Sequence, residues 1–234
     1  MNIIITGASS GVGFEAVLEL TLSGKHKVIA LARSQDKLQR LAEIAGSLNP
    51  DCVLYPIAFD IVHDDYADLL QFINSRFDNQ VDILINNAGV LVNKPFAELL
   101  ETDFVEMLQS NFIGHVRMIQ SVHHLMPDGS HIVNIGSMGG YQGSAKFPGL
   151  AAYSASKAAL HNLTECLAQE FAEAGIKVNC LALGSAQTEM LEKAFPGYES
   201  PVMAFEMGKY IADFALTGHR FFNGKILPVA VTTP

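Results

Sequence analysis

The chain has 234 residues, of which 49% are hydrophobic and 17% are charged; this favours one domain with a large core and excludes a disordered chain. Its 15 basic and 24 acidic residues give a formal net charge of −9, which supplies no basic face for nucleic acid or for an electrostatic membrane anchor. Three cysteines without a CxxC pair, and the lack of a signal-peptide pattern or a long apolar run, predict a soluble cytoplasmic protein.

Short apolar runs alternate with helical patterns from end to end. Six runs lack strict alternation, as expected for strands buried on both faces of a parallel sheet: Asn2–Ile5, Lys27–Ala32, Cys52–Ile57, Val81–Ile85, His131–Ile135 and Ile176–Leu183. The helical patterns are Val12–Ser23, Gln35–Gly46, Asp64–Phe77, Thr102–Met126, Ala152–Ala174 and a segment near Val202–Leu216, with a last strand within Phe221–Val231. This order predicts a single α/β domain over residues 1–234, with a doubly wound parallel sheet and helices on both faces.

The first predicted strand runs into a glycine-rich turn, Thr6-Gly7-Ala8-Ser9-Ser10-Gly11-Val12-Gly13, and a helix follows at once. Glycines allow a diphosphate to approach closely, and the free N–H groups and dipole of the helix favour an anion. The spacing is G-x3-G-x-G and differs from the G-x-G-x-x-G of the general dinucleotide fingerprint. An ordinary strand-to-helix turn is the alternative, but the position in the chain favours a cofactor cradle.

Tyr153 and Lys157 lie four residues apart at the start of a helical pattern, so they share a helix face. A nearby ammonium favours the phenolate, and we expect it to lower the pKa of Tyr153 toward neutrality. A tyrosine in that range is a usable general acid or base. Taken alone, a YxxxK pair is more often part of a solvated helix surface.

Together the two motifs resemble the short-chain dehydrogenase/reductase family, from Asn2 to about Met190. The segment Asn86-Asn87-Ala88-Gly89 matches the family's NNAG motif. The catalytic positions of the family are all filled, and in the family's order, by Asn111, Ser137, Tyr153 and Lys157. The resemblance implies a Rossmann-type fold. It also implies that Tyr153 transfers the proton, Lys157 lowers its pKa and holds the ribose, Ser137 binds the reacting oxygen and Asn111 holds a relay water.

The resemblance also implies a nicotinamide cofactor. NAD enzymes usually place an acid at the end of the second strand, where this chain has Ala32 followed by Arg33. Since arginine can pair with a 2′-phosphate, NADP(H) is the preferred cofactor and NAD(H) stays possible. Ser10 is not the basic residue that many NADP(H) members carry. The implied cofactor site comprises Gly7, Ser9, Ser10, Gly11, Val12, Gly13, Arg33, Asp60, Ile61, Asn87, Ala88, Gly89, Tyr153, Lys157, Gly184, Ala186 and Thr188.

Two features depart from the family pattern. Leu183 replaces the proline of the family's PGxxxT loop, although Gly184, Ala186 and Thr188 could still meet the nicotinamide. Ser137 and Tyr153 are separated by a longer segment than we expect, and its extra part near Tyr141–Phe147 either walls the substrate pocket or forms a surface loop. Apolar residues in these loops indicate an uncharged organic substrate.

Other chemistries find less support. The pairs His123/His124 and His161/Glu165 lack a third metal ligand at suitable spacing, so no metal is predicted. Ile135 occupies the first glycine position of a G-x-S-x-G motif around Ser137, which argues against a hydrolase. A cofactor-binding sensor or scaffold on the same fold is the alternative to an alcohol/carbonyl oxidoreductase, but it has no need of all four catalytic positions.

The helices Thr102–Met126 and Ala152–Ala174 carry apolar residues outside one core-facing stripe. A monomer would expose part of that surface, and pairing across a two-fold axis would bury it. Together with the family resemblance, this predicts a homodimer or homotetramer that acts on a small molecule, without nucleic acid or membrane partners. The apolar residues in question are Phe104, Val105, Met107, Leu108, Phe112, Ile113, Val116, Met118, Ile119, Ala155, Ala158, Ala159, Leu160, Leu163, Cys166 and Leu167.

Overall fold

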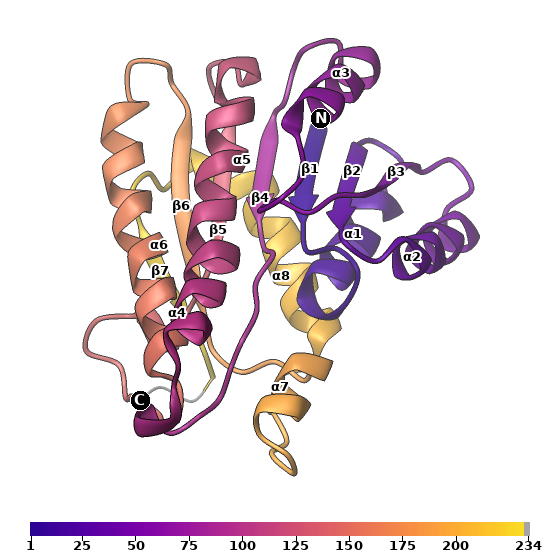
Figure 1. The fold of residues 1–234 in the computed structure, drawn as a ribbon. Coiled ribbons are helices and arrows are strands. Elements are labelled where there is room, and N and C mark those ends of the chain that lie inside the picture. Colours follow the sequence, from indigo (N-terminus) through magenta and orange to yellow (C-terminus); the bar gives the residue numbers. More distant parts are fainter. Residues whose placement is uncertain (232–234) are drawn as a thin grey trace.

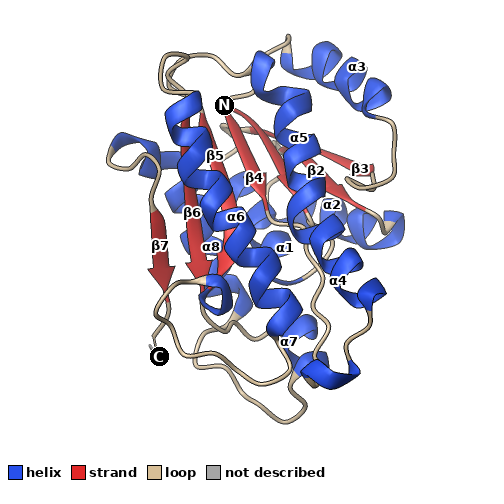
Figure 2. Cartoon of the chain, turned by 60° about the vertical axis from the view of Figure 1, so that its left-hand side comes forward, coloured by secondary structure: helices blue, strands red, loops and turns tan. Residues whose placement is uncertain are grey.

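Seven parallel strands form one sheet with helices on both faces (Figure 1, Figure 2) in a computed structural model that describes residues 1–231. The strand order is β3-β2-β1-β4-β5-β6-β7. The strands are β1 Asn2–Thr6, β2 Lys27–Ala32, β3 Val53–Ala58, β4 Ile83–Asn86, β5 His131–Ser137, β6 Lys177–Leu183 and β7 Ile226–Val229. The predicted doubly wound sheet is thus confirmed, while the last three residues of the predicted domain lie outside the described residues.

The helices follow the predicted order, with one break and one addition. They are α1 Gly11–Leu22, α2 Gln35–Leu48, α3 Tyr66–Phe77, α4 Glu101–Leu108, α5 Gly114–Val122, α6 Ala151–Glu170, α7 Glu189–Ala194 and α8 Ala204–Thr217. The single helix predicted over Thr102–Met126 is wrong, because a π-helical turn, Gln109–Ile113, separates α4 from α5. The short helix α7 was not predicted.

Two cores lie on opposite faces of the sheet, because successive strand residues point in opposite directions. Ile3 and Ile5 of β1 pack with buried residues of α1, α2 and α8, whereas Ile4 packs with residues of α3, α5 and α6. The strand residues in both cores are mostly aliphatic and buried, which explains why the strands read as continuous apolar runs. The sheet is therefore a rigid central layer that holds the loops at its edges.

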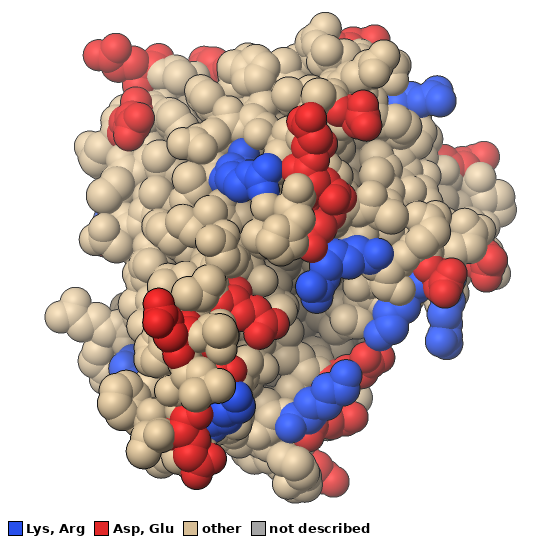
Figure 3. Space-filling model, in the orientation of Figure 1, with Lys and Arg blue, Asp and Glu red and all other residues tan. Residues whose placement is uncertain are grey.

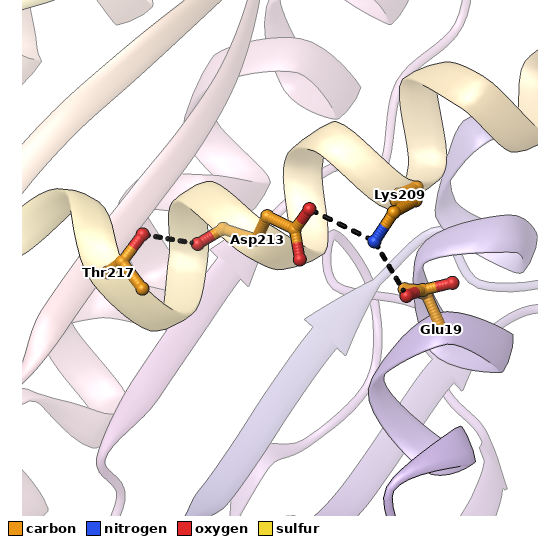
Figure 4. Close-up of polar contacts among 4 residues, drawn as sticks. All are labelled: Glu19, Lys209, Asp213 and Thr217. Atoms are coloured by element: carbon orange, nitrogen blue, oxygen red, sulfur yellow. Dashed lines mark hydrogen bonds and ion pairs between the residues drawn. The ribbon is translucent and has the colours of Figure 1, made fainter.

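Polar contacts add to the packing of α8 on α1. The Lys209 ammonium lies 3.1 Å from Glu19 of α1 and 3.1 Å from Asp213 one turn along α8 (Figure 4). A Cβ atom on Gly208 would lie 2.8 Å from the Ala16 backbone nitrogen, so the two helices approach closely at this glycine. The C-terminal helix is thereby fixed on the helix that follows the glycine-rich turn.

The strand order reverses direction between β1 and β4, where the chain crosses from one half of the sheet to the other. In open parallel sheets, ligands bind outside the carboxyl ends of the strands at such a switch point. In Figure 1 these ends lie at the lower edge of the sheet, near α4 and α7. The glycine-rich turn after β1 and the NNAG segment after β4 meet at this edge.

Two features that mark other classes of protein are absent from residues 1–231. None of the helices there combines the length and the apolar character needed to cross a membrane. Within the same residues, no group of three or more His, Cys, Asp or Glu side chains is placed to hold a metal ion.

Candidate active site

The glycine-rich turn forms a cradle at the start of α1. Gly7 and Gly11 have φ angles of +69° and +58°, which glycine adopts without a steric penalty. A Cβ atom on Gly7 would lie 2.6 Å from the Ala88 Cα atom, so the backbones after β1 and β4 are in close contact. The N-cap residue Ser10 makes no side-chain cap hydrogen bond, and no acidic residue lies in the first turn of α1. The first N–H groups and the positive helix end therefore fit a diphosphate.

The segment after β4 is fixed to this turn by hydrogen bonds. The Thr6 hydroxyl accepts from the backbone N–H groups of Asn87 and Ala88, each at 3.0 Å. The Asn87 amide in turn donates to the carbonyls of Thr6, at 3.0 Å, and Gly7, at 3.1 Å. Asn87, assigned to the cofactor from the sequence, thus uses its side-chain donors to shape the cradle.

The ends of β2 and β3 supply the residues predicted for the adenosine end of the cofactor. Ala32 is buried, whereas Arg33 is exposed and takes part in none of the ion pairs within residues 1–231. One Asp60 oxygen accepts from the Val62 N–H at 2.8 Å. The Ile61 side chain is buried in the core beside α5, so any contact of this residue with a cofactor would have to be made by its backbone.

Charged side chains around this end of the site are mixed. Figure 3 shows basic side chains gathered beside a hollow near the place of α2 in Figure 1, with acidic ones among them. Lys37 of α2 lies 3.0 Å from Glu189 of α7, and this pair lowers the pKa of the Glu189 carboxyl. Both side chains are about half exposed, so the pair contributes little to stability.

Asn111 lies in the π-helical turn and ties three segments together. Its side-chain oxygen accepts from the Val90 N–H at 2.8 Å, and its amide donates to the Val90 carbonyl at 3.0 Å. The amide also donates to the Ser156 hydroxyl at 3.0 Å, which donates to the Tyr153 carbonyl at 2.7 Å. Asn111 is fully buried, so this network sets the position of α6 relative to the segment after β4.

Ser137 and Tyr153 come together at the carboxyl end of β5. The Ser137 hydroxyl oxygen accepts from the Gly139 N–H at 3.1 Å, and Ser137 is also a hydrogen-bond partner of the Tyr153 hydroxyl. Burial raises the pKa of Tyr153, and the hydrogen bond to Ser137 opposes that rise. The expectation that Lys157 lowers the pKa of Tyr153 is therefore wrong for the protein without a cofactor. Desolvation of the phenolate outweighs the effects that lower this pKa.

Lys157 reaches into the same region from α6. Its ammonium donates to the Ile135 carbonyl at 2.8 Å and lies 6.0 Å from the centre of the Tyr153 ring. Burial lowers the pKa of Lys157 to about 8. A Cβ atom on Gly89 would lie 3.6 Å from the Lys157 nitrogen and 2.9 Å from the Asn111 side-chain oxygen. The structure thus brings together Gly89 and the catalytic positions predicted from separate parts of the chain.

The segment after β6 meets the cradle at one point. A Cβ atom on Gly11 would lie 3.3 Å from the Thr188 methyl group, and the Thr188 hydroxyl caps α7 by accepting from the Leu191 N–H at 3.2 Å. Gly184 packs against Ala230, and Ala186 is buried in the core. Of the three residues assigned to the nicotinamide from this loop, Thr188 is the one whose side chain lies against the glycine-rich turn.

A hollow of about 590 Å³ lies near the residues predicted to be catalytic. It separates the segment after β4 from the lengthened segment between β5 and α6, and Phe96 and Phe147 are among its exposed apolar residues. Ser154 lines it, while Ser137 and Tyr153 do not. Asn93 donates to the Ala194 carbonyl at 2.7 Å, which joins the segment after β4 to α7. Of the segment predicted near Tyr141–Phe147 as a pocket wall or a surface loop, Lys146 and Phe147 line this hollow.

Two residues of this region were not assigned to the site from the sequence. Ser156 links Asn111 to Tyr153, as described above. His161, considered only as a metal ligand and set aside, is buried and accepts the Ser137 N–H at 3.4 Å. The spacing in the sequence could have placed His161 at the site. It follows Tyr153 by eight residues and Lys157 by four, so the three share one face of a helix.

Comparisons with known proteins agree with this arrangement. The model of the short chain dehydrogenase family matches residues 1–199, which include the cradle and all four catalytic positions. An uncharacterized oxidoreductase of Staphylococcus saprophyticus is 32% identical over 192 residues, 80% of this chain and 79% of that protein. A dehydrogenase/reductase from Sinorhizobium meliloti has a TM-score of 0.83 and 26% identity, covering 97% of this chain and 92% of that one. ElxO with NADP bound has a TM-score of 0.83 and 27% identity, with coverages of 97% and 96%.

Proposed function

We propose that this chain, which belongs to the short-chain dehydrogenase/reductase family, is an NADP(H)-preferring oxidoreductase that interconverts an alcohol and a carbonyl compound. The observation that carries the proposal is the convergence of Asn111, Ser137, Tyr153 and Lys157 beside a glycine cradle. A protein that only senses a cofactor needs the cradle and not the proton-transfer group. The complete constellation therefore favours turnover.

The cradle residues would hold the cofactor at its diphosphate, because the N–H groups of the first turn of α1 are free for an anion. Asp60 has a carboxylate oxygen left for the adenine amino group, and Lys157 would hold the ribose. When bound, a nicotinamide cofactor supplies hydride transfer, and the protein supplies orientation and proton chemistry. Ala32 and Arg33 support NADP(H), because an acid is missing and the Arg33 guanidinium, exposed and outside the ion pairs of residues 1–231, is available for a 2′-phosphate.

Proton transfer is assigned to the Tyr153 hydroxyl. In the reducing direction it would give its proton to the carbonyl oxygen of the substrate, which Ser137 would hold by a hydrogen bond. Lys157 is charged below about pH 8 and favours the phenolate that remains on Tyr153. The Asn111 amide donates both its hydrogen bonds, to the Val90 carbonyl and to the Ser156 hydroxyl. We therefore assign Asn111 the role of positioning α6, and its amide does not bind a relay water.

The proposed oligomeric state is supported by exposed residues on α4, the π-helical turn and α6. Val105 is 49% exposed, Leu108 39% and Ile113 36%, and the exposed positions on α6 include the small residues Ala155 and Ala158. Large side chains on one helix and small ones on the other suit close helix packing across a two-fold axis. We propose a homodimer or homotetramer that contains this contact.

The proposed substrate is an uncharged organic molecule, in keeping with the exposed Phe96 and Phe147 beside the cluster. The proposed compartment is the cytoplasm, where the three unpaired cysteines would stay reduced. A turnover assay with NADPH over a panel of uncharged aldehydes and ketones tests the function. Oxidation of NADPH that depends on the carbonyl compound is expected. Tight NADPH binding without turnover across the panel would favour the sensor or scaffold instead.

A further inference from the structure

We infer that His161 is a positioning residue that holds Ser137, and through it the Tyr153 hydroxyl, in the arrangement used for proton transfer. This inference rests on the proposed function. His161 lies on α6 one turn after Lys157, and its side chain faces the end of β5. The residue is only 7% exposed, so it is part of the interior next to the catalytic cluster.

The His161 ring lies beside the turn that follows β5. Its Nε2 atom accepts the backbone N–H of Ser137 at 3.4 Å. The Gly140 backbone lies close enough to raise the pKa of the ring, although burial outweighs this effect. The ring therefore holds the last residue of β5 and lies near the end of the 3-10 turn Met138–Gly140.

Gly136 makes room for this ring. A Cβ atom at Gly136 would overlap the His161 Nε2 atom and would lie 2.7 Å from the Cys180 sulfur. The imidazole thus fills the space between β5, β6 and α6, the elements that Figure 2 shows packed together. Because the ring is enclosed, it cannot turn away from Ser137 without moving these elements.

The surroundings keep His161 neutral. Burial is the main cause that lowers the pKa of His161 to about 4, and the charges of Lys157 on α6 and Lys146 in the neighbouring loop lower it further. The facing thiol of Cys180 on β6 is itself neutral, since burial raises its pKa to about 12, and the Tyr141 ring stands edge-on at 6.5 Å. A neutral ring that accepts at Nε2 carries its proton at Nδ1. It supports Ser137 and does not exchange protons with the substrate.

Ser137 is consequently held from two sides. The His161 ring fixes its backbone N–H, and the Gly139 N–H donates to its hydroxyl oxygen at 3.1 Å. The hydroxyl that meets Tyr153 is thereby set at one place and one orientation. Loss of the histidine acceptor leaves a poorly exposed N–H without a partner and frees the turn to shift, which should affect the chemical step more than cofactor binding.

The hydrogen bond itself is tested by NMR on the wild-type protein, without any turnover. Long-range correlations between ring protons and nitrogen in uniformly ¹⁵N-labelled protein report which ring nitrogen carries the proton. We expect the Nδ1–H tautomer for His161 and no change in its ring shifts until the pH falls to about 4. An Nε2–H tautomer, or titration near the ordinary histidine pKa of about 6.5, would overturn the inference. This test stands even if no carbonyl substrate is found.

The effect on the reaction is tested by three variants. H161F keeps a ring but removes the acceptor, H161Q offers an amide oxygen in its place, and H124F changes an exposed histidine as the matched control. We expect H161F to lower kcat about 10- to 100-fold, with the Kd for NADPH unchanged, while H161Q recovers most of the loss and H124F behaves as wild type. Equal kcat in H161F and wild type, or equal losses in H161F and H161Q, would refute the positioning role. If H161F does not fold, the NMR result and the H161Q kinetics decide.

Discussion

Replacing Tyr153 by phenylalanine removes one oxygen atom from the centre of the proposed site. The ring keeps its place at the start of α6, and the backbone carbonyl of Tyr153 still accepts from Ser156. The cradle residues, whose contacts do not involve the Tyr153 hydroxyl, are untouched. The substitution therefore separates proton transfer from cofactor binding and from folding.

The structure sets the size of effect that distinguishes a chemical role from a structural one. In the protein the hydroxyl has a hydrogen bond with Ser137, and a typical net contribution of such a bond is about 1 kcal/mol, or roughly fivefold in an equilibrium or a rate. A positioned general acid contributes about 10²–10⁴-fold. A loss in kcat of at least 100-fold thus cannot come from the missing hydrogen bond alone.

The assay follows oxidation of NADPH with a carbonyl compound found active in the panel, and fluorescence titration gives the Kd for NADPH in parallel. We expect kcat to fall by about 10²–10⁴-fold while the Kd changes little. Tyr210→Phe, which removes a hydroxyl from an exposed position on α8, is the control and should leave both quantities unchanged. Retention of more than about a tenth of kcat in Tyr153→Phe would refute the reasoning, because a positioned general acid typically contributes about 10²-fold or more.

Three further outcomes are expected. Arg33→Ala should weaken NADPH binding about 10- to 100-fold through loss of a charge-assisted phosphate contact and leave NADH binding unchanged; equal losses, or a wild-type preference for NADH, would contradict the NADP(H) proposal. Because burial lowers the pKa of Lys157 to about 8, its ammonium is present below that pH and lost above it. Turnover should therefore fall as pH rises through about 8. If Lys157→Arg shows the same fall in turnover near pH 8, the fall belongs to another titratable group. Light scattering should give a dimer or tetramer at micromolar concentration. Leu108→Glu should weaken this assembly, whereas the control Leu48→Glu, at the end of α2, should not. A monomeric wild-type protein would exclude the proposed assembly.

The sheet and the cradle could be predicted from the sequence because local signals determine them. The strands of a parallel sheet are buried on both faces, so each appears as an apolar run whatever its neighbours are. Gly7 and Gly11 mark the turn because their left-handed φ angles favour glycine. The catalytic positions followed from the family resemblance, and the structure brings them to one edge of the sheet.

The features that were missed depend on contacts between distant segments. The helix predicted over Thr102–Met126 has the right periodicity, but Asn111 bonds with Val90 and Ser156, and a π-helical turn is found at that point. The pKa of Tyr153 rises because of burial, which the spacing from Lys157 does not reveal. His161 was set aside as a metal ligand, and its partner, the Ser137 N–H, lies 24 residues away in the sequence.

Two buried hydrogen bonds between polar side chains join β4 to β5 and β5 to α6. Asn86 of β4 donates to the Asn134 side-chain oxygen on β5 at 2.9 Å, and Asn134 donates to the Thr164 hydroxyl on α6 at 2.9 Å. All three side chains are fully buried, so each lost partner would leave a costly unsatisfied group. These bonds therefore favour one register between β4, β5 and α6. Because Asn87 follows Asn86 directly and Lys157 precedes Thr164 by two turns of the same helix, that register also aligns the cradle with the proton-transfer group.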